Sequence, residues 1–176
     1  NSGYVGYTGG NTQTGGSTEN FAGGSGGSHG GRGAEGYLAN AATVYDSVSN
    51  PLLPGGGGPG AESYYSPGAN GGGVVVITAS SMSVEGSILA EDDMSFATYA
   101  GGGGGTINLT VSGTITGSGT LSVAAKDSSF TDELGGGGRM AIKNYTSLSG
   151  TLTLKVNGGN GSGSYDGSSG TLYLKP

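Results

Sequence analysis

Residues 101–110 read GGGGGTINLT, a run of glycines that leads directly into alternating polar and aliphatic residues. The same arrangement recurs as Gly73-VVVIT, Gly138-RMAIK and Gly170-TLYLK, and subtraction places the four leading glycines, with Gly105, 32 or 33 residues apart. Because successive residues of a strand face opposite sides, each segment predicts a strand with one aliphatic face and one more polar, outward face. The aliphatic positions are Val75, Ile77, Ile107, Leu109, Met140, Ile142, Leu172 and Leu174.

A second predicted strand recurs inside each unit, followed by a polar loop of variable sequence. It is seen as EGSILA from Glu85, GSGTLSVA from Gly117 and LSGTLTLKV from Leu148. Two strands and a returning loop per unit predict a coil that stacks on itself, with strands pairing in parallel around a narrow aliphatic core. We therefore predict an all-β fold over residues 71–176, a parallel β-solenoid (β-helix-like) of about four repeats of about 32 residues. The glycine runs are interpreted as tight corners that need positive φ.

Residues 1–70 have a different pattern, with glycine pairs interleaved with Ser, Thr, Asn and Tyr and no alternating apolar run. One interpretation is extended, partly polyproline-II-like glycine strands, and the other is a mobile Gly/Ser linker. Six tyrosines in this region favour packing. We expect a glycine-rich N-terminal region, residues 1–70, that is packed on the solenoid or clasps a neighbouring copy.

The overall composition excludes several classes of protein. Of 176 residues 43 are glycine, none is cysteine, and the net charge is −6. The six basic residues form no cluster, so a nucleic-acid surface is not expected. No apolar stretch approaches the roughly 18 residues of a membrane span. Few Lys and Glu among many Gly, Ser, Thr, Asn and Tyr suggest an extracellular or cell-surface protein.

No set of residues predicts catalysis. His29, the one histidine, is flanked by Gly and Ser, and no Ser-His-Asp pattern or phosphate-binding loop occurs. We therefore predict a non-enzymatic protein without catalytic residues or a cofactor. The densest acidic cluster, Glu91, Asp92 and Asp93, is a candidate calcium site because Ca²⁺ prefers oxygen ligands, although a solvated loop is the favoured interpretation.

Three sequons make Asn108, Asn144 and Asn160 candidates for N-glycosylation. Asn108 is predicted on the outward face of its strand and Asn160 in a loop, and both positions would permit a glycan.

The two ends of the predicted coil are candidate assembly edges. Val74 and Val76 are apolar on the predicted outward face, and Leu172 and Leu174 lie in the last predicted strand, with no capping segment expected after them. An open strand edge is a template for pairing with another chain, and a non-closing contact between identical units makes a filament. We expect a homo-oligomer or homopolymer joined head to tail.

The segments GGSGGSHGGRG, SNPLLPGGGG, GGGVVVITA with VEGSILA, and GGGGRMAIKNYTSLSG with GTLYLKP resemble the glycine-rich units of large secreted and cell-surface proteins of bacteria and microbial eukaryotes. The resemblance implies a β-solenoid-like part in an extracellular structural or adhesive assembly, either a self-assembling filament subunit or a segment of a giant surface protein. The alternative is a carbohydrate-binding module that uses Tyr99 or Tyr173. An ice-binding protein and a polysaccharide lyase rank below both.

Overall fold

A computed structural model describes residues 25–36, 40–58, 68–94, 100–128, 133–161 and 165–176. These residues form ten strands and no helix. The strands are β1 (Val74–Ala79), β2 (Met82–Val84), β3 (Ser87–Leu89), β4 (Thr106–Val111), β5 (Thr114–Gly117), β6 (Thr120–Ser122), β7 (Arg139–Lys143), β8 (Ser147–Leu148), β9 (Thr153–Lys155) and β10 (Thr171–Lys175). In this part of the chain, no helix is long and apolar enough to cross a membrane.

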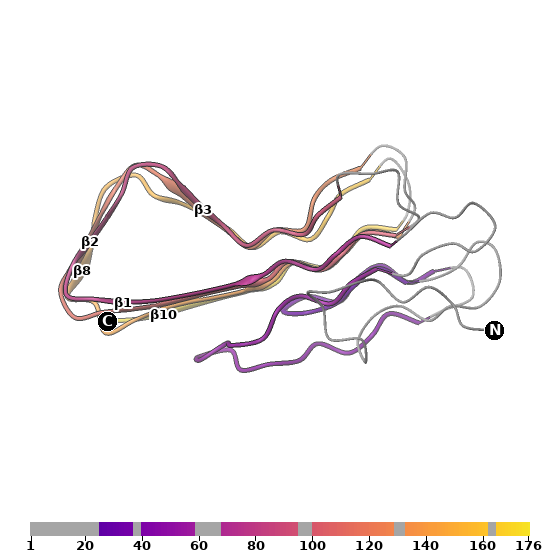
Figure 1. The fold of residues 1–176 in the computed structure, drawn as a ribbon, viewed down its shortest axis with the longest axis horizontal. Coiled ribbons are helices and arrows are strands. Elements are labelled where there is room, and N and C mark those ends of the chain that lie inside the picture. The colour runs from indigo at the N-terminus through magenta and orange to yellow at the C-terminus, as the bar shows by residue number, and fades with distance from the viewer. Residues whose placement is uncertain (1–24, 37–39, 59–67, 95–99, 129–132, 162–164) are drawn as a thin grey trace.

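The strands form three parallel sheets that wind around a common axis. The strand orders are β1-β4-β7-β10, β2-β5-β8 and β3-β6-β9. Val74 pairs with Thr106, Thr106 with Arg139, and Arg139 with Thr171, so partners lie 32 or 33 residues apart by subtraction. Figure 1 looks along the stacking direction, where the chain passes through β1, β2 and β3 before the next turn overlies the first. This parallel arrangement fits a β-solenoid.

Each of the first three turns has three strands and the last turn has only β10, so the prediction of two strands per turn was incomplete. The additional strands, β2, β5 and β8, are only two to four residues long. An alternation over so few residues is too short to stand out in the sequence. The corner after β5 lies at Gly117, whose φ is 122° and which takes a conformation that favours glycine.

The aliphatic core lies between the three sheets. Ile107 and Leu109 of β4, Ile115 of β5 and Leu121 of β6 are all completely buried. They pack in one cluster with residues of the neighbouring turns, such as Ile142 of β7. The predicted inward face is therefore confirmed for β4 and β7.

The outward face of β4 and β7 differs from the prediction of a solvated surface. Thr106, Asn108 and Arg139 are only 0%, 2% and 4% exposed, respectively. The cause is a covering segment, residues 45–54, whose backbone accepts hydrogen bonds from all three side chains. Figure 1 shows the described N-terminal residues as an additional layer beside the long sheet and the glycine runs.

The glycine runs are extended, close-packed rows, so their interpretation as corners was wrong. Among the described glycines only Gly117 and Gly150 have positive φ. Three successive amides of one run donate in three different directions: Gly103 to Gly56 in the N-terminal layer, Gly104 to Gly136 in the next turn, and Gly105 to Ala90 on the opposite wall. In an extended chain with three residues per turn, successive amide groups point in three different directions around the chain axis, as they do here.

Backbone contact in these rows predicts opposite effects of the same substitution at two equivalent positions. An alanine Cβ at Gly105 would lie 2.0 Å from the Gly73 carbonyl oxygen, whereas a Cβ at Gly73 has no atom within 4 Å. We expect Gly105→Ala to lower the free energy of unfolding by about 3 kcal/mol because the backbone must shift. We expect Gly73→Ala to leave it unchanged or raised by up to about 1 kcal/mol.

Urea unfolding of both variants, at protein concentrations where the chain is monomeric, measures this difference. Equal stabilities of the two variants would contradict the close packing of the rows.

Candidate functional site

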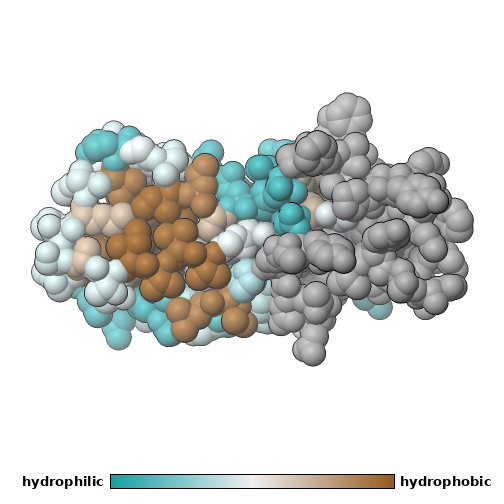
Figure 2. Space-filling view, viewed as in Figure 1, coloured by the Kyte–Doolittle hydropathy of each residue, from teal (hydrophilic) through white to brown (hydrophobic). Residues whose placement is uncertain are grey.

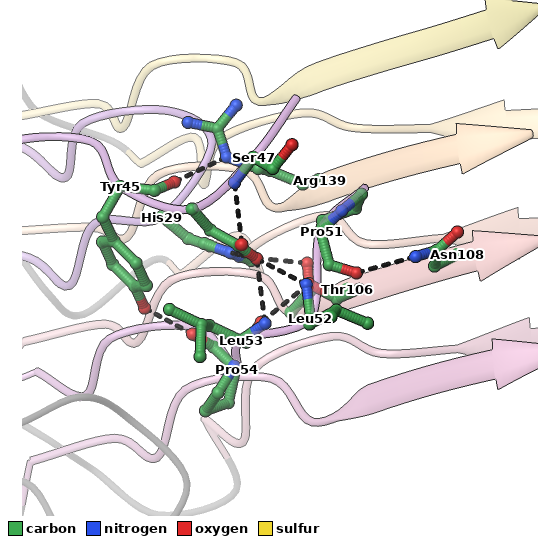
Figure 3. A network of polar contacts seen from close by, with 12 residues as sticks. His29, Tyr45, Ser47, Pro51, Leu52, Leu53, Pro54, Thr106, Asn108 and Arg139 are labelled. Atoms are coloured by element: carbon green, nitrogen blue, oxygen red, sulfur yellow. Dashed lines mark hydrogen bonds and ion pairs between the residues drawn. The ribbon is translucent and has the colours of Figure 1, made fainter. Parts of the chain in front are cut away.

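The covering segment is fastened to the long sheet by a buried polar network (Figure 3). The Thr106 hydroxyl donates to the Leu53 carbonyl at 2.7 Å, and the Asn108 side-chain amide donates to the Pro51 carbonyl at 3.0 Å. The Arg139 guanidinium donates to the carbonyl of Tyr45 at 2.6 Å. Because buried polar groups are costly unless hydrogen-bonded, each of these side chains requires the covering segment.

Asp46 holds the turn of the covering segment. Its φ is 68°, a left-handed conformation that Asp tolerates better than most residues. One carboxylate oxygen accepts from the amides of Leu52 and Leu53, both at 2.8 Å, and the other accepts from the Ser47 amide at 2.7 Å. Burial by itself would raise the pKa of Asp46, but these hydrogen bonds hold it below its ordinary value. The carboxylate therefore remains ionised at neutral pH.

His29 is a fully buried structural residue. Its Nδ1 lies 2.9 Å from the carbonyl oxygen of Gly104, and its Nε2 lies 3.5 Å from the Asp46 carboxylate. Its ring packs against that of Tyr45, with centroids 4.8 Å apart. Burial lowers the pKa of His29, although the hydrogen bonds to Gly104 and Asp46 oppose the shift. Both nitrogens face protein groups, so the geometry gives this histidine a fastening role.

The acidic cluster separates into three environments. Glu91 accepts from the Ser122 hydroxyl at 2.6 Å, and Asp93 is exposed. Asp92 is 2% exposed and accepts from the Lys126 amide at 2.7 Å, while its second oxygen has no hydrogen-bond partner in the described part of the chain. No group of three His, Cys, Asp or Glu among the described residues is arranged to hold a metal ion. The calcium hypothesis therefore remains a prediction without a donor set.

Burial changes the chemistry of Asp92. Desolvation raises its pKa to about 7, against the lowering effect of the Lys126 amide. The burial of Asp92 could have been predicted from the sequence. Asp92 follows Ile88 and Ala90 at intervals of two residues, so it belongs to the set of residues that face inward.

The candidate glycan-related residues have different surroundings. Asn108 is buried with its side-chain nitrogen bonded to the covering segment, so the expectation of an exposed position that would permit a glycan was wrong. Asn144 and Asn160 are exposed, although Ser162 of the Asn160 sequon lies outside the described residues. Tyr173 is half-buried on β10, and Tyr99 lies outside the described residues.

The predicted edge residues lie on the two outermost strands of the long sheet, β1 and β10. Val74 and Val76 of β1 are exposed on the outward face, as expected. Leu172 and Leu174 of β10 occupy the inward register of Met140 and Ile142. They are nevertheless 41% and 42% exposed, whereas those two residues of β7 are completely buried.

The opposite end of the coil is open in the same way. Inward residues of the first turn are only partly buried, namely Val75, Ile77, Met82 and Ile88. Figure 2 looks onto one end of the coil and shows hydrophobic side chains gathered across the described part of that face. The two open ends are the candidate functional site, because they expose the edge of the core.

The turn held by Asp46 gives a prediction for the covering segment. Asparagine keeps the left-handed preference but replaces one acceptor oxygen with a donor, so a backbone amide loses its partner. We expect Asp46→Asn to lower the free energy of unfolding by about 1.5–3 kcal/mol, and to speed hydrogen exchange at the amides of Leu52 and Leu53. Asp166→Asn is the control, because Asp166 is exposed and accepts, among the described residues, from the Gly161 amide. Unchanged exchange in Asp46→Asn would contradict the role of this turn.

The buried carboxyl of Asp92 predicts a pH dependence of stability. A folded pKa of about 7, above the ordinary value of 3.8, means that its stabilising contribution is complete below pH 3.8 and is lost as pH rises through 7. Asp92→Asn removes this titration, so we expect the variant to have a higher Tm than the parent chain at pH 8. The difference between the two Tm values should shrink as pH falls from 7 toward 4. A constant difference over this range would show that Asp92 titrates normally.

Comparison of the chain with protein-family models, with curated proteins and with solved structures gives no match in any of the three searches. The geometry of this chain is therefore the guide to its function. The covering segment is hydrogen-bonded to the outer face of the long sheet, and inward aliphatic side chains are exposed at both ends of the coil.

Proposed function

We propose that the chain is a non-enzymatic structural or adhesive unit of an extracellular or cell-surface assembly, in which copies associate head to tail. It would serve as a self-assembling filament subunit or as a segment of a giant surface protein. The observation that carries the proposal is the exposure of inward core residues at both ends of the coil, such as Leu172 and Leu174.

The exposed edges favour association by two physical effects. Burial of a fully exposed aliphatic side chain contributes about 1.5–3 kcal/mol, and several inward side chains are partly exposed at each end. Edge strands also present unpaired N–H and C=O groups that an added strand can satisfy. Because the two ends of one molecule are different surfaces, their contact is heterologous and does not close on itself, which produces filaments.

The finer architecture in this proposal is a solenoid of about four repeats of about 32 residues, with a partly polyproline-II-like glycine-rich region, residues 1–70. The strand register and the three directions of the glycine hydrogen bonds support it. The resemblance of its segments to glycine-rich units of secreted and cell-surface proteins supports the extracellular setting.

Charged residues in the exposed core edge should prevent assembly. We expect the wild-type chain to form filaments or large oligomers as its concentration rises, and the double variant Leu172→Lys, Leu174→Lys to remain monomeric at the same concentrations. The reason is that lysine at these inward positions would be buried in the contact without a partner. Light scattering after size-exclusion chromatography, with electron microscopy of the pooled material, measures the difference.

Thr114→Lys is the matched control, because Thr114 is exposed at the start of β5, the central strand of its sheet. It adds one positive charge, against two in the double variant, away from both ends and should assemble like the wild type. A wild-type chain that stays monomeric at high concentration would rule out the proposal.

A further inference from the structure

We propose a defined register for the head-to-tail contact, in which β10 of one copy pairs in parallel with β1 of the next copy. This inference rests on the proposed self-assembly and specifies its interface. The sheet order β1-β4-β7-β10 would continue with another β1, so that Leu172 packs on Val75 and Leu174 on Ile77 of the next copy. The occupant of the open edge is thus a second copy of this chain.

The internal contacts of the coil define this register. Val75, Ile107, Met140 and Leu172 form one column through successive pairs, and Ile77, Leu109, Ile142 and Leu174 form another. The two short sheets have only three strands each, because the last turn contributes β10 alone, so the proposed contact joins the long sheets and leaves β8 and β9 one turn short of β2 and β3 of the next copy.

The glycine rows can continue across the same contact. Gly72 donates to the Gly103 carbonyl, Gly104 to the Gly136 carbonyl, and Gly137 to the Ser168 carbonyl, each bond joining one turn to the next. Ser169 occupies the equivalent position in the last turn. In the proposed register its amide would donate to the Gly71 carbonyl of the next copy, so the backbone bonds of the rows extend without a change of geometry.

Charge gives the contact its polarity. Residues 71–94, the first turn, contain four acidic and no basic residues, for a formal charge of −4. Residues 139–176 contain four basic residues and one acidic residue, for a formal charge of 4 − 1 = +3. Opposite ends therefore attract and like ends repel, which favours head-to-tail over head-to-head contact.

Gly73 has no structural need to be glycine within a single copy. It has no positive φ, and a Cβ there would meet no atom of the described residues within 4 Å. At the equivalent positions Gly105, Gly138 and Gly170, a Cβ would lie 1.9–2.0 Å from the carbonyl oxygen of the equivalent glycine in the preceding turn. In the proposed stack the Gly170 carbonyl of the preceding copy would take that place beside Gly73. The requirement for glycine at this position then appears only on assembly.

Gly73→Ala therefore separates folding from assembly. We expect its monomer to have an unchanged Tm, while the protein concentration needed for assembly rises at least about tenfold. High salt should weaken assembly of the wild type as well, because it screens the charges of the two ends. Assembly of Gly73→Ala at the wild-type concentration would overturn the proposed register.

Disulfide cross-linking tests the register directly, because the chain has no cysteine of its own. The register pairs Tyr173 with Val76 of the next copy, and paired strands lie about 4.8 Å apart, within disulfide range. We expect a mixture of Val76→Cys and Tyr173→Cys to form a mixed disulfide dimer on oxidation. Val74→Cys mixed with Tyr173→Cys is the matched control, because a shift of two residues gives roughly 8 Å and no bond.

The outcomes separate the two proposals. If the wild type assembles but only the shifted pair cross-links, the register is wrong and the self-assembly stands. If the wild type stays monomeric, the proposed function fails and the register fails with it.

Discussion

Direct contact between backbones in the glycine rows is the constraint on which the rest of this structure depends. A Cβ at Gly104 would lie 1.8 Å from the Val123 carbonyl oxygen, and a Cβ at Gly135 equally near the Gly102 carbonyl oxygen. At such distances there is no room for a side chain, so this part of the molecule cannot be stabilised by apolar burial between rows. Hydrogen bonds between backbones take over that role, with successive amides serving the N-terminal layer, the next turn and the opposite wall.

This constraint explains why the N-terminal layer belongs to the fold. A row whose amides point in three directions needs acceptors on three sides, and the coil provides only two of them. Gly56 and Gly27 of the layer provide the third, as acceptors for Gly103 and Gly136. Once the layer lies there, the covering segment buries the outer face of β4 and β7. Their polar side chains then have to find partners in it, as Asn108 does at the Pro51 carbonyl.

The sequence predicted those parts of the fold whose cause is local. Alternation predicted the long strands and their inward residues, because a period of two is visible over five or six residues. It failed for β8, which is two residues long. It also failed for Asn108 and Thr106, whose burial is caused by residues 45–54 at a distance of more than fifty positions in the chain. The glycine runs were misread because local sequence does not distinguish a residue that needs positive φ from one that needs an absent side chain. For the candidate site, the alternation of aliphatic residues predicted the edge residues. It did not lead to a prediction that Asp92 is buried. Asp92 continues the two-residue period of Ile88 and Ala90, but it lies in the segment that was read as a polar loop.

Aliphatic side chains are buried between neighbouring turns in the middle of the coil, and the same side chains remain partly exposed at its two ends. A turn of this narrow solenoid buries its few aliphatic side chains only when turns lie on both sides of it, as β4 does between β1 and β7. With four strands in the long sheet, two are outer strands, so about half of the inward side chains there remain partly exposed. A short chain with 32% hydrophobic residues has little other apolar area to set against its chain entropy. In the proposed assembly, stacking of copies would raise the fraction of completed turns without lengthening the chain.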